Sequence, residues 1–148
     1  MTGRILVDSN ILVYAYDRSE PEKQARAAAI LEQLFITGTG ILSTQVLAEF
    51  FVAVTRKITR RLSVEQALES LSNYVASWEV LGLNSLNCLE AARGVRDHGF
   101  SYYDAQIWAV ARMNQVMVVF SEDFKPSWIE GVQLVNPFAP DFILADWV

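Results

Sequence analysis

Short apolar segments alternate with amphipathic helical segments along the whole chain, and this alternation constrains the fold more than any other feature. The apolar segments are two to five residues long, which suits buried strands better than helices. Strands that alternate with helices favour an α/β layer fold with a mostly parallel sheet. The sequence therefore predicts a sheet of about five strands, at residues 5–7, 41–42, 79–83, 116–120 and 132–135.

Helix-start and helix-stop signals separate these strands. Ser63 begins a capping-box pattern with Gln66, and Ser19 begins a similar pattern, followed by a helix that ends at Gly38 and Gly40. The remaining helices are predicted at residues 45–57, 86–95 and 101–113.

The chain has 148 residues, which fits one domain over residues 1–148, with an apolar tail at 139–148 that packs on its own domain or in a subunit interface. Its single cysteine excludes an internal disulfide. No signal-peptide or membrane-span pattern is present, so we expect a cytoplasmic chain without membrane contact. A net charge of −5 argues against a basic nucleic-acid binder, so a polyanion needs a local basic patch or metal ions.

Four acids belong to separate predicted elements: Asp8, Glu49 and Asp104, which stand almost alone in apolar surroundings, and Asp123, which lies three residues past the predicted strand at 116–120. Each lies near a predicted strand end or helix start, and ligands of parallel sheets bind at the carboxyl ends of strands. Carboxylates that converge without histidine or cysteine hold hard cations such as Mg²⁺ or Mn²⁺. Such cations activate water for phosphodiester hydrolysis.

Each acid also has a purely structural interpretation. Asp8 could cap a helix at 11–16, and Asp104 lies three residues after Ser101 in another capping-box pattern. Glu49 could face solvent, and Asp123 could belong to an ordinary acidic loop. Single residues leave both interpretations open, whereas the four together favour a site.

The same acids carry a resemblance to a known family. The segments that carry it are Leu-Val-Asp-Ser-Asn-Ile-Leu-Val-Tyr (6–14), Leu-Ser-Thr-Gln-Val-Leu-Ala-Glu-Phe (42–50), Ser-Tyr-Tyr-Asp-Ala (101–105), Ser-Glu-Asp-Phe (121–124) and Val-Asn-Pro-Phe (135–138). In this order the chain resembles the PIN-domain family, and most closely its VapC-like toxin ribonucleases. The resemblance implies a three-layer α/β/α fold and an endoribonuclease that depends on Mg²⁺ or Mn²⁺.

The resemblance also implies roles for residues and partners. Asp8, Asp104 and Asp123 would hold one ion, and Glu49 a second ion or a water molecule. Glu122 competes with its neighbour for the fourth position, and Asp123 is favoured. Ser9, Asn10 and Ser121 would position a ligand or water. The implied partners are an RNA substrate, a second copy of the chain and a small antitoxin that offers an arginine to the carboxylates.

A basic cluster lies at the end of the helix predicted at 45–57 and just after it, and comprises Arg56, Lys57, Arg60 and Arg61. If the helix continues, Arg56 lies about 10 Å from Glu49 along the axis on nearly the same face, where it could guide an RNA backbone. The alternative is a solvated helix end. The tyrosines nearest the predicted site, which could stack on bases, are Tyr14, Tyr16 and Tyr102. The single histidine, His98, is expected to be a cap or surface residue.

Three other functions compete with a toxin. A housekeeping RNA-processing nuclease would use the same site, and only an antitoxin gene beside this one separates the two. A non-catalytic binding module would lack some of the acids. A receiver-like signalling domain would need an acid beside Asp8, and Ser9 stands there.

Overall fold

A single six-stranded sheet organises the chain. The computed structural model describes residues 3–148. The strand order is β3-β2-β1-β4-β6-β5, and every pair is parallel except β5 with β6. The strands are β1 (Ile5–Val7), β2 (Gly40–Ser43), β3 (Glu79–Leu81), β4 (Val118–Phe120), β5 (Ser127–Ile129) and β6 (Val132–Val135).

All five predicted strands are present, but the predicted number is one short. The additional strand is β5, which forms a hairpin with β6 through Glu130 and Gly131. Both turn residues have positive φ, 49° and 83°, as a tight two-residue hairpin turn requires.

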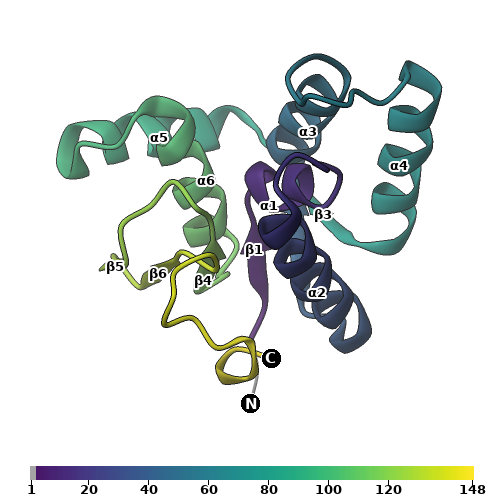
Figure 1. Ribbon diagram of the computed structural model, residues 1–148. Helices are drawn as coiled ribbons and strands as arrows, with labels where there is room; N and C mark the ends of the chain where they lie inside the picture. The colour runs from purple at the N-terminus through teal and green to yellow at the C-terminus, as the bar shows by residue number, and fades with distance from the viewer. Residues whose placement is uncertain (1–2) are drawn as a thin grey trace.

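Two groups of helices cover the two faces of the sheet, which confirms the three-layer α/β/α prediction. The chain builds outward from β1 to β2 and β3, and then returns across β1 to β4, so right-handed crossovers place the later helices on the opposite face. In Figure 1, α5 and α6 lie on one side of β1, and α3 and α4 lie on the other. The helices are α1 (Ser9–Tyr14), α2 (Pro21–Thr37), α3 (Thr44–Arg56), α4 (Val64–Ser77), α5 (Ser85–His98), α6 (Tyr102–Met113) and a 3₁₀ turn η1 (Leu144–Asp146).

Three of the four predicted caps are present, at Asp8, Ser63 and Ser101. The Ser63–Gln66 capping box is present in full. The box at Ser19 was a wrong prediction: α2 begins at Pro21 with Glu20 as its N-cap residue, and the Ser19 hydroxyl donates instead to Asp17 at 2.6 Å. Proline at the first helical position presets φ and needs no N–H partner, so this helix starts without a side-chain cap.

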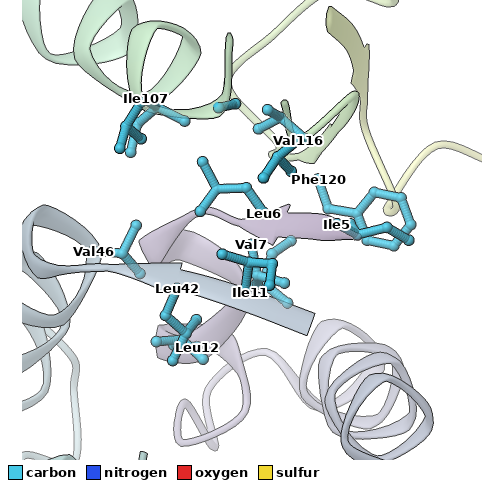
Figure 2. Close-up of a cluster of buried hydrophobic side chains, with 14 of the residues drawn as sticks. Ile5, Leu6, Val7, Ile11, Leu12, Leu42, Val46, Ile107, Val116 and Phe120 are labelled. Carbon is cyan, nitrogen blue, oxygen red and sulfur yellow. The ribbon is translucent and has the colours of Figure 1, made fainter. Parts of the chain in front are cut away.

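The core lies on both sides of β1. Ile5, Leu6 and Val7 are all buried, as expected for a strand covered on both faces. Figure 2 shows Leu6 pointing toward Ile107 and Val116, whereas Val7 and Leu42 lie on the side of α1. This alternation joins the two helical layers through one central strand.

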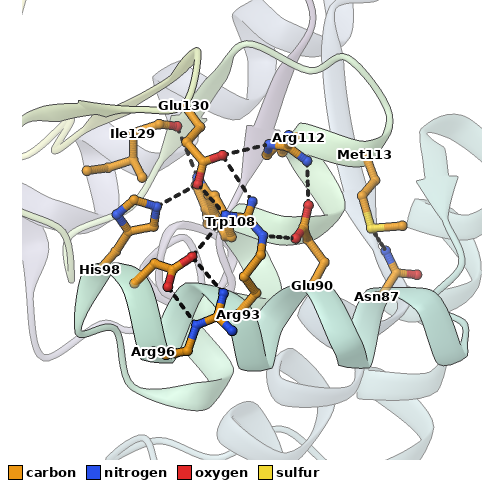
Figure 3. A network of polar contacts seen from close by, with 11 residues as sticks. Asn87, Glu90, Arg93, Arg96, His98, Trp108, Arg112, Met113, Ile129 and Glu130 are labelled. Carbon is orange, nitrogen blue, oxygen red and sulfur yellow. Dashed lines mark hydrogen bonds and ion pairs between the residues drawn. The ribbon is translucent and has the colours of Figure 1, made fainter.

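A polar network fastens α5 to α6 and to the β5–β6 turn (Figure 3). Arg93 makes two hydrogen bonds to Glu130, at 2.9 and 3.0 Å, and a 2.5 Å ion pair with Glu90. His98 shares a 2.6 Å hydrogen bond with Glu130, and Arg112 pairs with Glu90. The hydrogen bond from Arg93, followed by that from His98, lowers the pKa of Glu130 to about 2. His98 is the exposed last residue of α5, as predicted for a cap or surface residue.

The tail at 139–148 packs on its own domain. The rings of Phe142 and Trp147 meet Phe120 edge-on at centroid distances of 5.5 and 5.9 Å. Arg26 of α2 donates to the carbonyls of Pro137 and Ala139 and holds the start of this segment. None of the helices within residues 3–148 has the length and apolarity needed to span a bilayer.

Candidate functional site

The four predicted acids come from four elements around the point where the sheet topology reverses. Asp8 directly follows β1, and Glu49 lies in α3, which starts immediately after β2. Asp104 is in the first turn of α6, and Asp123 follows β4. Since β1 pairs with β2 on one side and β4 on the other, the crevice at its carboxyl end is the topological switch point, where ligands bind in open α/β sheets.

Asp8 is buried, with 3% of its surface exposed. Its Oδ1 accepts from the Ser9 amide and its Oδ2 from the Ser121 hydroxyl, both at 2.7 Å. Burial nevertheless raises the pKa of Asp8 to about 6, and the negative charges of Glu49 and Asp123 add to this effect. Asp8 thus caps α1 and also holds a costly buried charge at the switch point.

Asn10 and Ser121 connect Asp8 to the loop after β4. The Asn10 amide nitrogen lies 3.2 Å from the Ser121 hydroxyl, 3.3 Å from Asp123 Oδ2 and 3.5 Å from Asp8 Oδ2. The side-chain oxygen of Asn10, Oδ1, accepts from the backbone amide of Glu122 at 3.3 Å. Ser9 reaches the other side of the site, where its hydroxyl donates to Glu49 at 3.3 Å. The predicted supporting residues therefore contact three of the four acids.

Electrostatic coupling shows that the acids share one region. Burial, followed by the charges of Asp104 and Asp123, raises the pKa of Glu49. Burial and then the charge of Asp104 likewise raise the pKa of Asp123. None of the four takes part in an ion pair with any residue of the described chain.

The donor chemistry fits a hard cation, because these side chains offer only oxygen ligands. As the side chains stand, however, no three His, Cys, Asp or Glu residues among 3–148 are arranged around a common metal position. Metal ligation by these acids therefore stays a prediction, and it requires the carboxylates to turn toward one another.

Glu122 and Asp123, which the sequence could not separate with certainty, lie in different surroundings. Glu122 accepts from the Tyr14 hydroxyl at 2.5 Å and from Lys23 Nζ at 2.7 Å, so the ammonium group of Lys23 neutralises its charge. Lys23 also lies over the Tyr14 ring, 4.8 Å from its centroid. Asp123 has Asn10 as its side-chain partner instead. This arrangement supports Asp123 as the fourth acid.

A groove of about 620 Å³ runs beside Glu49. Its polar lining comprises Ser9, Thr44, Gln45, Glu49, Lys57 and Gln106, besides the tyrosine described below. From the predicted basic cluster only Lys57, the C-cap residue of α3, lines this groove. The other three members of the cluster do not line it, and all three are exposed: Arg56, Arg60 and Arg61.

None of the three tyrosines predicted to lie nearest the site lines this groove. Tyr14 is bound to Glu122, Tyr16 packs on Phe50 at 5.3 Å, and Tyr102 is absent from the groove wall. The aromatic residue that lines the groove is Tyr103, which the sequence analysis missed together with Gln45 and Gln106. The one available signal was the i, i+3 spacing of Tyr103 and Gln106, which places both on one face of a helix.

Comparison with known proteins links the sequence to one family and the fold to several solved structures. The PIN domain family matches residues 5–127. No curated protein matches the sequence. The fold resembles a toxin–antitoxin complex from Klebsiella pneumoniae, with a TM-score of 0.66 and 18% identity over 90% of this chain and 98% of that chain.

Two further solved structures share the fold. VapC20 from Mycobacterium tuberculosis, described as a Sarcin-Ricin loop cleaving toxin, has a TM-score of 0.61 and 16% identity over 80% of this chain and 91% of its own. VapBC2 from Rickettsia felis, bound to a DNA fragment from its promoter, has a TM-score of 0.60 and 19% identity over 89% of this chain and 97% of that chain. With the family match covering most of the sequence, the chain belongs to the PIN domain family.

Proposed function

We propose that this PIN domain is a metal-dependent endoribonuclease and the toxin of a toxin–antitoxin pair. The observation that carries the proposal is the contrast between its acids. Glu90, Glu122 and Glu130 are neutralised by lysine or arginine, whereas the acids at the switch point have no cationic partner within residues 3–148. Asp8 in particular is a buried carboxylate without such a partner, and retaining it is costly, so the cluster has a purpose other than stability.

In this proposal Asp8, Asp104 and Asp123 hold Mg²⁺ or Mn²⁺, and Glu49 holds a second ion or orients a water molecule. A divalent cation bound there would supply the activation of water and the charge stabilisation that phosphodiester hydrolysis needs. Asn10 and Ser121 fix the orientation of Asp8 and Asp123 through the hydrogen bonds described above. Ser9 restrains Glu49 in the same way.

The comparisons support the toxin assignment. Structures of similar fold include toxin–antitoxin complexes from Klebsiella pneumoniae and Salmonella typhimurium. In each complex the matched chain is about as long as this one. The cognate antitoxin would be a small protein that offers an arginine to the acids, since guanidinium pairs with carboxylates in a bidentate manner. RNA as the substrate and a homodimer as the active form belong to the same proposal.

Cleavage of a mixed pool of structured and single-stranded RNA tests the proposal. Wild-type protein should cut the pool with Mn²⁺ or Mg²⁺ and lose this activity in EDTA. The Asp8→Asn/Asp104→Asn variant should be inactive, whereas the matched Glu122→Gln variant should keep most of its activity because Glu122 is paired with Lys23. Folded wild-type protein that neither cuts RNA nor binds metal in calorimetry would instead support the non-catalytic binding module.

Lys57 should contribute more to RNA affinity than the rest of its basic cluster, because it alone lines the groove. Removal of one phosphate contact reduces the slope of log affinity against log salt by about 1. We therefore expect Lys57→Ala to flatten the salt dependence of RNA binding, measured by fluorescence anisotropy. Arg61→Ala is the matched control, and an equal effect of both variants would contradict the placement of RNA in this groove.

A further inference from the structure

Tyr103 presents an aromatic surface on the α6 wall of the groove. Its side chain lines the groove that also contains Glu49, and 65% of the residue is exposed. Exposed aromatic rings on a protein that handles single-stranded nucleic acid are stacking platforms, because every base offers a π-face. A stacked base here would lie beside one of the four acids.

The Tyr103 segment is held in place rather than free. Gln45 of α3 donates from Nε2 to the Tyr103 carbonyl at 3.1 Å and so joins the two walls of the groove. The ring of Tyr102 meets the Tyr103 ring edge-on at 5.5 Å. Ser101 caps the same helix turn. A platform that is positioned before binding loses less conformational entropy when a base stacks on it.

Gln106 adds a group that can read the edge of a base. It lies one helical turn after Tyr103, and its Nε2 donates to Gln45 Oε1 at 2.8 Å, which fixes the amide plane. Within residues 3–148, its carbonyl oxygen has no hydrogen-bond donor. The remaining N–H and this oxygen form a donor–acceptor pair, the pattern with which amide side chains recognise base edges.

We propose that this groove is a subsite for one unpaired nucleobase next to the scissile phosphate. Tyr103 stacks on the base, Gln106 hydrogen-bonds to its edge, and Lys57 contacts the adjoining phosphate. The inference rests on the proposed ribonuclease function and specifies its substrate as single-stranded or looped RNA. Paired bases in a duplex are already stacked and cannot enter a groove of this kind.

Binding of labelled single strands tests this subsite separately from catalysis. The probes are oligouridylate, oligoadenylate and oligocytidylate, with an abasic ribose-phosphate strand of the same length. They are titrated in Mg²⁺ against protein carrying Asp8→Asn, which keeps the strands intact. Adding Tyr103→Ala should weaken binding of the base-bearing strands by about 5- to 150-fold, the usual range for one stacked base, and leave the abasic strand unchanged.

Three matched variants sharpen the result. Tyr103→Phe keeps the aromatic face and should bind like the parent, as should Trp128→Ala, which removes an exposed aromatic ring outside the groove. Gln106→Ala should reduce the differences in affinity among the three homopolymers. Equal binding of abasic and base-bearing strands, equal losses for Trp128→Ala and Tyr103→Ala, or no binding at all would overturn the subsite.

The two proposals fail in distinguishable ways. Base-dependent binding through Tyr103 without any cleavage by the wild-type protein would retain the subsite and reject the nuclease. Cleavage that needs Asp8 but keeps the same sequence preference and rate in Tyr103→Ala would retain the nuclease and reject the subsite.

Discussion

Replacement of Asp8 by asparagine is expected to abolish RNA cleavage and, at the same time, to make the metal-free protein more stable at pH 7.5. Cleavage should fall by about 10³-fold or more, because a lost metal ligand removes several kcal/mol of charge stabilisation. The gain in stability has a different origin. Asp8 is a buried charge without a cationic partner in residues 3–148, and asparagine removes that charge while it keeps the shape.

The sign of the pH dependence follows from the pKa of Asp8, which is about 6 in the folded protein against an ordinary value of 3.8. Since the folded pKa is the higher one, the charge destabilises the fold fully above pH 6. The penalty then disappears as the pH falls from 6 toward 3.8. A shift of about two units corresponds to about 3 kcal/mol.

Asparagine should recover only part of this penalty. The Ser121 hydroxyl donates to Asp8 and already accepts from Asn10 and from the Asp123 amide, so it cannot easily accept another N–H. We expect a gain of about 1–2 kcal/mol at pH 7.5 and none near pH 4.

Thermal unfolding in EDTA at several pH values measures this gain. Asp146→Asn, a change at an exposed acid, is the control and should have no effect at either pH. A loss of stability in Asp8→Asn at pH 7.5, or a gain that does not depend on pH, would contradict the account of Asp8 as a buried, unpaired charge.

The parts of the fold that local sequence determines were predictable. The buried strands and the caps at Ser63 and Ser101 each depend on a few neighbouring residues. The missed strand β5 lacks such a signal, because it has three residues, directly follows Pro126, and owes its strand conformation to antiparallel pairing with β6. Glu130 in its turn adopts a positive φ that its residue type does not favour, so the hairpin was hidden.

In the candidate site, too, local sequence predicted some residues, whereas others depend on contacts between distant segments. Asp8, Glu49 and Asp104 were recognisable because each is isolated in apolar sequence, whereas Asp123 stands beside Glu122. The distinction between Glu122 and Asp123 depends on Lys23, which is 99 residues away from Glu122 and cannot be paired with it from local pattern. The groove wall depends on contacts between Gln45 of α3 and the first turns of α6, two helices from opposite sides of the sheet. No periodicity within either helix indicates that contact.

The close packing of α5 on α6 leads to the prediction with the largest expected effect on stability, Gly94→Val. A Cβ atom at Gly94 would lie 2.8 Å from Cζ3 and 3.0 Å from Cε3 of Trp108, and 3.4 Å from the Ala105 Cβ. Trp108 cannot yield, because it is fully buried and its indole donates to the Ile129 carbonyl at 3.1 Å. Overpacking at such a position should lower the free energy of unfolding by about 3 kcal/mol or more.

Urea denaturation of Gly94→Val beside Ala92→Val isolates the steric effect. Ala92 is exposed on the same helix, so its change to valine carries only the propensity cost, about 0.5 kcal/mol. Trp108→Leu should partly relieve the clash, so the double variant Gly94→Val/Trp108→Leu should be less destabilised than the sum of the single changes. Equal losses for the two valine variants would refute the tight fit. Because α6 carries Asp104 and Gln106 as well as Trp108, this packing also fixes the helix that contributes one acid and one groove wall to the site.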